Sequence, residues 1–371
     1  MIKILNTGDL HLGKKYASHR EDIGKKYSLA RFEALKKLIS TANEQHCDYI
    51  IAAGDVFDTK NTSVSDISSA CNILGNFEGS VIVIPGNHDY YEGKDDRLWT
   101  RFLKEKSENT MLLTENKKYA VDDLVLYPAI CHSKHSGENA IGWIKSENIP
   151  SDDEKIHIGI AHGSIDGISP DPNREYFPMS IDELNSCNVD LWLIGHTHVP
   201  YPSEPVLSSP KILNAGTHQQ TDIADNSEGS AFLVSIDDGK KITAERIHTG
   251  VLRFVRLDLT LTHGDSLENA LENILSEYQS DAENISVRIN ISGIALKPDY
   301  DRREELYDRY KNCFIDFEVF DNELNAEITS VMIDAETNAG SIENELLKKY
   351  INEPDVLNLA FDLIKKCKEC E

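Results

Sequence analysis

The chain has 371 residues, which is enough for one large or two ordinary domains with a substantial hydrophobic core. Its net charge of -25 comes from 38 basic and 63 acidic residues, and excludes general adhesion to nucleic acid or anionic membranes but allows a local basic patch. The sequence shows no signal-peptide pattern and no apolar run of bilayer length. We therefore expect a soluble, cytoplasmic protein that does not associate with membranes.

The cysteines favour a reducing compartment. There are seven, an odd number, scattered and mostly in apolar contexts, unlike a disulfide framework. Cys367 and Cys370 form a single Cys-x-x-Cys pair at the end of the chain. Because no second Cys/His pair lies nearby, we do not expect a zinc site there.

The first 250 residues alternate apolar strands with amphipathic helices. We expect strands at 2–5, 49–53 and 81–84, and helices at 27–45, 67–74 and around 99–103. From about residue 110 the expected strands are closer together, which favours antiparallel pairs. They fall at 124–127, 156–160, 191–194, 211–213, 231–236 and 241–247. The pattern predicts an α/β fold of two packed sheets with helices outside.

The pattern changes near Gly250. Strands are expected at 251–261, 285–291 and 313–319, with helices at 266–278 and 302–310 between them. Two amphipathic helices around Pro354 close the chain. We expect a main domain at 1–250, a small α/β capping domain at 251–340 and C-terminal helices at 341–371.

Polar residues follow five of the expected strands. The apolar run Val81-Ile82-Val83-Ile84 stops at Pro85-Gly86, and Asn87-His88-Asp89 follow at once. Four other strand ends carry Asp9 and His11, Asp55 and Asp58, His162, and His196 with His198, each beside a glycine. Any one of these is compatible with an ordinary polar turn. Five of them in order indicate a shared site.

The side chains at these ends form a metal-ligand set. The candidate ligands are Asp9, His11, Asp55, Asn87, His162, His196 and His198. Nitrogen and oxygen donors without thiolate suit Mn, Fe or Zn better than Ca or Mg alone. Seven ligands are too many for one ion but suit two ions about 3.5–4 Å apart, bridged by one carboxylate.

This part of the chain, roughly residues 1 to 220, resembles the calcineurin-like metallophosphoesterase superfamily. The superfamily's signature motifs occur here in the same order: D-x-H, GD-x-x-D, GNH-D/E, H and GH-x-H. The resemblance implies an α/β/β/α sandwich and two metals. Asp9, His11, Asp55 and His198 would hold one, and Asp55, Asn87, His162 and His196 the other. His88 would act on the phosphate or leaving oxygen, with Asp58 keeping it protonated by favouring the imidazolium. In some repair nucleases of the superfamily a histidine replaces that aspartate.

Two segments, Asp9-Leu-His11-Leu-Gly13 and Gly54-Asp55-Val-Phe-Asp58-Thr59, resemble SbcD-type exonuclease subunits of double-strand-break repair complexes. This resemblance implies a Mn-dependent 3′ to 5′ DNA exonuclease with some endonuclease activity, in which a hydroxide between the metals attacks the phosphodiester. It also implies a homodimer and a partner, an SbcC-type coiled-coil ATPase. Residues 341–366 are our candidate docking element, although packing onto their own domain explains them equally well.

A basic segment follows His11. It contains Lys14, Lys15, Arg20, Lys25, Lys26 and Arg31 against only Glu21 and Asp22. We interpret it as a loop, in which the first five residues bind the DNA backbone beside the metals. A solvated loop whose lysines only promote solubility is an equally open interpretation.

Two other functions remain open. The first is a phosphoesterase for small molecules or phosphoproteins, since a metal site does not choose its substrate. The second, a non-catalytic scaffold, is disfavoured because it would not need every ligand.

Four other histidines and two tyrosines could have functional or structural roles. We expect His132 and His135 at the surface and His157 to be structural, while His218 is a further candidate for lining the site. Tyr90 and Tyr91 could stack on a base or sugar, or simply pack.

Overall fold

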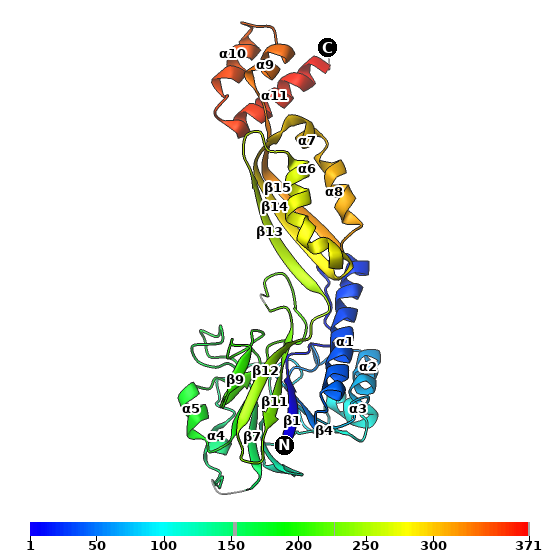
Figure 1. The fold of residues 1–371 in the computed structure, drawn as a ribbon, viewed down its shortest axis with the longest axis vertical. Coiled ribbons are helices and arrows are strands. Elements are labelled where there is room, and N and C mark those ends of the chain that lie inside the picture. The colour runs from blue at the N-terminus through cyan, green and yellow to red at the C-terminus, as the bar shows by residue number, and fades with distance from the viewer. Residues whose placement is uncertain (151–153, 226, 370–371) are drawn as a thin grey trace. The chain divides into compact units, whose positions relative to one another are not determined.

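A computed structural model describes residues 1–150, 154–225 and 227–369. Its contacts divide the chain into two units, Met1–Leu252 and Arg253–Glu371. Figure 1 shows the elements of both. The expected division into 1–250, 251–340 and 341–371 stays a prediction, because the contacts separate two units and say nothing of the functional role of each part.

Two sheets form the first unit. The larger has the order β4(Thr110–Leu112)-β3(Ser80–Ile84)-β2(Tyr49–Ala53)-β1(Ile2–Thr7)-β11(Ser230–Ile236)-β12(Ile242–His248)-β9(Val206–Ser208). The smaller has the order β10(Ile212–Asn214)-β8(Leu191–Gly195)-β7(Ile156–His162)-β6(Leu124–Ala129)-β5(Tyr119–Val121). Apolar side chains such as Ile51 and Leu193 pack between the sheets in one buried cluster. The sheets therefore form a sandwich.

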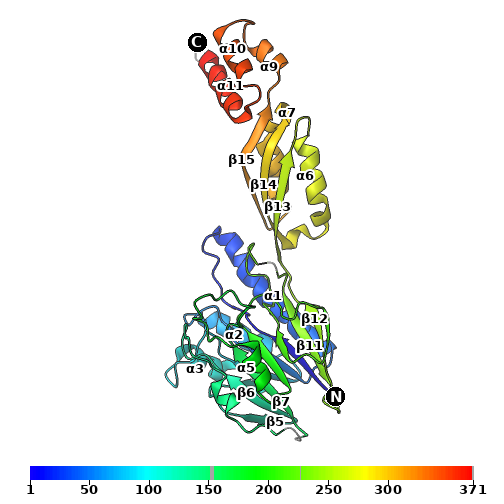
Figure 2. The same ribbon diagram turned by 90° about the vertical axis from the view of Figure 1, so that its left-hand side faces the viewer.

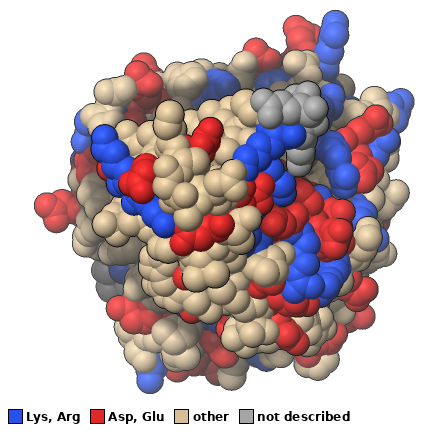
Figure 3. Space-filling view, turned by 90° about the horizontal axis from the view of Figure 1, so that it is seen from above, with Lys and Arg blue, Asp and Glu red and all other residues tan. Residues whose placement is uncertain are grey.

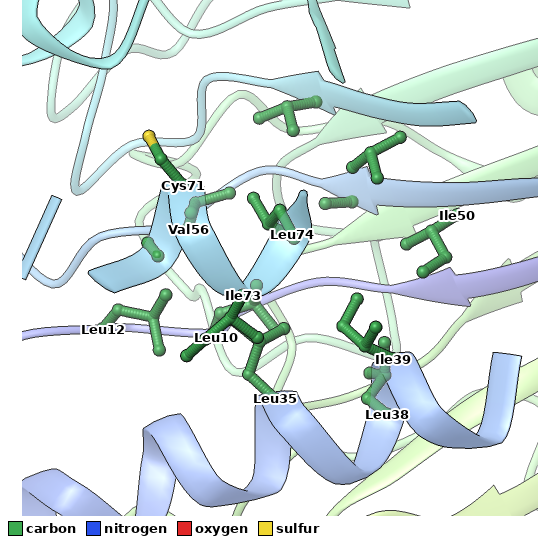
Figure 4. Packing of buried hydrophobic residues seen from close by; sticks show 14 of the residues in the cluster. Leu10, Leu12, Leu35, Leu38, Ile39, Ile50, Val56, Cys71, Ile73 and Leu74 are labelled. Carbon is green, nitrogen blue, oxygen red and sulfur yellow. The ribbon is translucent and has the colours of Figure 1, made fainter. Parts of the chain in front are cut away.

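Helices cover the outer faces of this sandwich. The larger sheet packs against α1(Glu21–Glu44), α2(Val64–Leu74) and α3(Arg97–Glu105). Figure 4 shows Leu35 and Leu38 of α1 and Leu74 of α2 within this cluster, together with Ile50 of β2. The short helices α4(Gly142–Lys145) and α5(Ile181–Ser186) cover the smaller sheet. The predicted α/β/β/α architecture is confirmed.

The expectation of antiparallel pairs beyond residue 110 is wrong for most of the smaller sheet. Strands β6, β7, β8 and β10 pair in parallel, whereas β5 with β6 and β11 with β12 are antiparallel. The connections between the parallel strands carry α4 and α5, which cross back over the outer face. Because both faces of this sheet are buried, its strands are continuous apolar runs that do not reveal their direction.

The second unit contains a three-stranded parallel sheet, β13(Arg253–Leu261)-β14(Ile285–Leu296)-β15(Asp316–Glu327). Helices α6(Leu267–Leu275), α7(Lys297–Asp301) and α8(Arg303–Lys311) and the 3₁₀ segment η1(Ser276–Asn284) connect the strands, and Figure 2 shows α6 beside β13. A small separate core joins α9(Ser330–Glu336), α10(Ile342–Lys349) and α11(Pro354–Glu369). Of these three helices, α9 was not anticipated.

The surface carries charges of both signs. Figure 3 shows Lys and Arg side chains interspersed with Asp and Glu on the face in view. Within the described ranges, no helix is both long and apolar enough to cross a membrane.

Candidate metal centre

The five polar strand ends belong to β1, β2 and β3 of the larger sheet and to β7 and β8 of the smaller one. These strands pair in parallel within each sheet, so their carboxyl ends share an edge. The structure brings all seven predicted ligands together there, in two overlapping groups.

The first group contains Asp9, His11 and His198. The Nε2 atoms of the two histidines lie 3.1 Å apart, and each lies 3.9 Å from Asp9 Oδ1. Asp55 Oδ2 lies 3.8 Å from His11 Nε2. Three donors so close together, with a second carboxylate beside them, suit one metal ion.

The second group contains Asn87, His162 and His196. Asn87 Oδ1 lies 2.9 Å from His162 Nε2 and 3.0 Å from His196 Nδ1. Asp55 Oδ2 lies 3.3 Å from His162 Nε2. Asp55 therefore adjoins both groups, as the bridging ligand of a two-metal site must.

The backbone is strained at four of these residues. The φ angles of Asp9, His11, Asp55 and His196 are 50°, 42°, 51° and 109°. Residues other than glycine adopt such angles infrequently, and the surrounding structure must then hold them there. The strand ends thus place these side chains at a cost in backbone conformational energy.

Two glycines allow the ligands to approach closely. A Cβ atom on Gly54, whose φ is +88°, would overlap the imidazole of His162. A Cβ on Gly86 would overlap the carboxylate of Asp55. Glycine at both positions is therefore a packing requirement of the site.

The electrostatics fit a divalent cation. Burial lowers the pKa of His11 to about 4 and that of His196 to about 3, so both imidazoles are neutral donors at pH 7. Burial raises the pKa of Asp9 to about 7, and the charge of Asp55 adds to this effect. Although burial also opposes ionisation of Asp55, the nearby His162 keeps its pKa well below the usual range. A bound cation would stabilise both carboxylates and replace the proton that His162 shares with Asp55.

His88 lies outside these two groups, but one of its ring nitrogens lies within 4.8 Å of donor atoms of His11 and Asp58. Its main-chain N–H donates to Asp55 Oδ1 at 2.7 Å, and its Nδ1 donates to the main-chain oxygen of Asp58 at 2.9 Å. Its ring meets that of His11 edge-on, with centroids 4.7 Å apart. This leaves Nε2 for chemistry at the metal centre.

The predicted support of His88 by the Asp58 carboxylate stays a prediction, because that carboxylate lies within 4.8 Å of ring nitrogens of both His88 and His11. Asp58 Oδ1 lies 3.5 Å from His11 Nδ1 and 3.6 Å from Lys14 Nζ. Although burial opposes it, His11 and then Lys14 lower the pKa of Asp58. The turn after β2 presents the carbonyl of Asp58 to His88 and directs its side chain to the ligand His11. Asp58 therefore orients a metal ligand.

Sequence reasoning missed two buried charged residues. Arg31 of α1 is fully buried and donates to the main-chain oxygens of Asp9 and Leu10 and to Thr217 Oγ1. The carboxylate of Asp89 accepts from Phe57 N at 3.0 Å and from Gly86 N at 2.7 Å, which ties the second and third strand ends together. Arg31 shares the helical spacing of Leu35, Leu38 and Ala42, and this signal could have revealed its burial.

The basic segment after His11 is not one loop. Helix α1 begins at Glu21, so Lys25 and Lys26 lie on its first turns, and Arg31 is removed from the surface. Lys25 pairs with Glu21 at 2.6 Å, and Arg20 lies 3.5 Å from Asp22.

Of the five predicted DNA-binding residues, Lys14 adjoins the metal centre through Asp58. Lys15 and Lys26 are exposed. The excess of basic over acidic side chains on the surface of this segment is therefore smaller than the sequence predicts.

The other residues considered do not join the ligand groups. His132 and His135 are exposed, and His157 is buried 3.0 Å from the hydroxyl of Tyr127. His218 is fully buried and donates from Nε2 to the Arg31 carbonyl, so it supports α1 rather than lining the site.

The two tyrosines after the third strand end also take structural positions. Tyr91 packs against the core, and the ring of Tyr90 lies 5.0 Å from Lys60 Nζ. Cys370 lies outside the described residues.

Comparison with known proteins agrees with this geometry. The family model for calcineurin-like phosphoesterases matches residues 2–200, and the chain belongs to this family. An uncharacterized metallophosphoesterase of Bacillus subtilis, YhaO, is 25% identical over 309 residues, covering 79% of this chain and 72% of its own.

Two relatives are named DNA double-strand break repair protein Mre11. The one from Methanosarcina acetivorans is 23% identical over 299 residues, covering 79% of this chain and 46% of its own. The one from Methanosarcina mazei is 24% identical over 301 residues, with 79% and 45% coverage. The chain thus spans about half the length of these Mre11 relatives.

Family membership supports a metal-dependent phosphoesterase and implies divalent metal ions. The donor set at the sheet edge has the residue types and the shared carboxylate that such ions require.

Proposed function

We propose that this protein is a two-metal phosphodiesterase that cleaves DNA, of the SbcD type, with Mn-dependent 3′ to 5′ exonuclease and some endonuclease activity. The observation that carries the proposal is the meeting of two ligand groups at Asp55 with His88 beside them. The similarity to two proteins named for DNA double-strand break repair supports DNA as the substrate. Because those relatives are about twice as long as the matched region, the activity of the whole protein is part of the proposal.

Asp9, His11, Asp55 and His198 would hold one metal, and Asp55, Asn87, His162 and His196 the other. When bound, the two ions activate water as a nucleophile and offset the charge of the phosphoryl oxygens.

In this mechanism His88 acts on the leaving oxygen. Its Nδ1–H bond to the Asp58 carbonyl fixes the orientation of the ring, and a proton held at Nε2 stabilises the charge that develops on that oxygen.

Cleavage of end-labelled linear duplex DNA, with and without Mn, tests the proposal. Wild-type protein should shorten the labelled strand from its 3′ end only with metal, and Asp55→Asn should abolish cleavage. Intact DNA together with hydrolysis of bis(p-nitrophenyl) phosphate would instead favour the small-molecule or phosphoprotein phosphoesterase.

The lysines near the site provide a second test of the substrate. We expect Lys14→Ala with Lys15→Ala to weaken DNA binding and to flatten its salt dependence. The adjacent exposed pair Lys117 and Lys118, before edge strand β5, is the matched control. Equal losses in the two double variants would contradict a DNA path along Lys14.

The proposed partner is an SbcC-type coiled-coil ATPase that docks on the C-terminal helices. On α11 the side chains of Leu359 and Leu363 are 65% and 54% exposed, and on α10 Ile342 is 85% exposed. Exposed apolar side chains at helical spacing suit a partner helix. Co-purification of wild type, but not of Leu359→Glu with Leu363→Glu, tests this docking. Light scattering of the purified chain tests the proposed homodimer.

A further inference from the structure

A cavity in the first unit is lined in part by residues that follow a metal-ligand candidate. Its volume is about 470 Å³, and its walls include Val199, Pro200, Ser203, Arg246 and His248. Val199 and Pro200 directly follow the metal-ligand candidate His198. One wall of the cavity therefore continues from the GH-x-H turn.

The sheet register places the opposite wall at the same edge as the ligands. Arg246 on β12 faces Phe232 on β11, which in turn faces Asn6 on β1, three residues before Asp9. Two strand spacings separate Arg246 from Asn6, about 10 Å.

A chain of contacts also links this cavity to the ligands. His248 is paired with Ser230, whose N–H donates to the Thr217 carbonyl at 2.9 Å. Thr217 Oγ1 in turn donates to the Asp9 carbonyl at 2.9 Å. The cavity and the metal centre thus share a rigid wall.

The lining of this cavity contains one arginine, Arg246, and one carboxylate, Glu228. Arg246 is half-buried, on the face of β12 where Ile242 and Ala244 point into the inter-sheet core. Among the described residues, no carboxylate lies within ion-pair distance of its guanidinium, and the one acidic residue in the lining, Glu228, is exposed. A half-buried guanidinium without an acidic partner is a strong, directional donor to phosphate oxygens.

We propose that this cavity binds a phosphate of a polynucleotide substrate other than the one being cleaved, with Arg246 as its donor. The inference rests on the proposed function and names a contact that a small phosphodiester cannot make. A nucleic acid strand carries one phosphate per ~3.4 Å of helix axis. Arg246 lies about 10 Å across the sheet from Asn6, which is three residues before Asp9. A strand held at the metal centre therefore presents phosphates other than the scissile one on the side of the site where Arg246 lies.

The test compares one-phosphate and many-phosphate substrates. Arg246→Ala should raise KM for a single-stranded oligonucleotide about tenfold, the equivalent of losing one charged hydrogen-bonding group, with kcat within about twofold. KM for bis(p-nitrophenyl) phosphate should not change. Arg246→Lys, which keeps the charge but loses the fork, should give an intermediate KM.

Lys241→Ala is the control. Lys241 is exposed and directly precedes β12, at the other end of the strand from Arg246. Unchanged kinetics of Arg246→Ala on the oligonucleotide would overturn the proposal. So would equal changes on both substrates, which would indicate a general effect on the metal centre or the fold.

A binding measurement separates this proposal from the proposed function. A fluorescent oligonucleotide in EDTA reports binding without cleavage. If wild type cleaves the small diester but not DNA, the proposed function fails. In that case, weaker oligonucleotide binding by Arg246→Ala than by wild type would still support the subsite. Equal binding by the two proteins would overturn it. Inorganic phosphate that competes at micromolar concentration would show a site for the free ion rather than for a strand, and would also overturn the proposal.

Discussion

Arg31 Nη2 donates to the main-chain oxygen of Asp9 at 3.1 Å, and this bond connects helix α1 to the first metal-ligand candidate. The same guanidinium donates to the Leu10 carbonyl at 2.8 Å and to Thr217 Oγ1 at 3.0 Å. Since all of these acceptors are buried, no water can replace the arginine. The position of Asp9 thus depends on a side chain that never contacts substrate.

Replacing Arg31 should therefore affect both stability and metal binding. We expect Arg31→Met to lower the free energy of unfolding by about 3 kcal/mol, because several buried carbonyls lose their donor. Thermal unfolding of metal-free protein and Mn titration measure the two effects. Arg20→Met, at an exposed arginine, should change stability by less than about 0.5 kcal/mol. Similar results for both variants would contradict the role of Arg31 in holding Asp9 in position.

Adjacent residues on the third strand end should respond differently to mutation. We expect Asn87→Ala to lose bound metal, since Asn87 Oδ1 lies among the donors of the second group. His88→Ala should keep its metal but lose about 10²–10⁴-fold in kcat. Elemental analysis of the purified variants, with kinetics on a small diester, provides the measurement. Metal loss in both would show that His88 is a ligand.

Asp58 should act through His11. We expect Asp58→Asn to weaken Mn binding by about 10–100-fold, because its carboxylate lies 3.5 Å from His11 Nδ1. The pH profile of kcat at saturating metal should stay in place, since the hydrogen bond that orients His88 goes to the main-chain oxygen of Asp58. A shifted profile with unchanged metal affinity would support the role that the family resemblance implies.

The second unit should lose local stability in acid through Asp299. Although burial opposes ionisation, hydrogen bonds from Ser266 Oγ and then Arg302 lower the pKa of Asp299. Because the folded pKa lies below the ordinary value of about 3.9, the stabilisation is complete above that value and is lost as pH falls through the folded pKa.

Hydrogen exchange of α6 amides in the full-length chain at pH 3 to 6 tests this prediction. The difference between wild type and Asp299→Asn should shrink below pH 4. Asp301→Asn, at an exposed carboxylate of α7, is the control and should show no such difference. A difference as large at pH 3 as at pH 6 would contradict the role of ionised Asp299.

The sequence predicted β2 and β3 of the larger sheet because they are apolar runs that end at glycine or proline, but it missed the short strands β4 and β9. It did not predict strand direction in the smaller sheet, since a strand buried on both faces lacks the alternation that marks a half-exposed one. It also placed the start of α1 near Tyr27 instead of Glu21, because the first turn is exposed and polar. Hydrophobic periodicity detects a helix only where one of its faces is buried, so it misses an exposed first turn.

The candidate ligands could be found from sequence because chemistry restricts their residue types and spacing. The contact between Asp58 and His11 could not, since it depends on which way one turn directs its side chain. Arg31 was assigned to the surface because charged residues are rarely buried, although its helical position pointed inward. That prediction gave more weight to the charge of Arg31 than to its position on the helix.

The positive φ angles of Asp9, His11, Asp55 and His196 set activity against stability. Glycine or asparagine would adopt these angles more readily, so inactivating changes such as Asp9→Gly relieve strain while they remove a ligand. At these four positions a substitution that removes a metal ligand should therefore raise the stability of the metal-free protein.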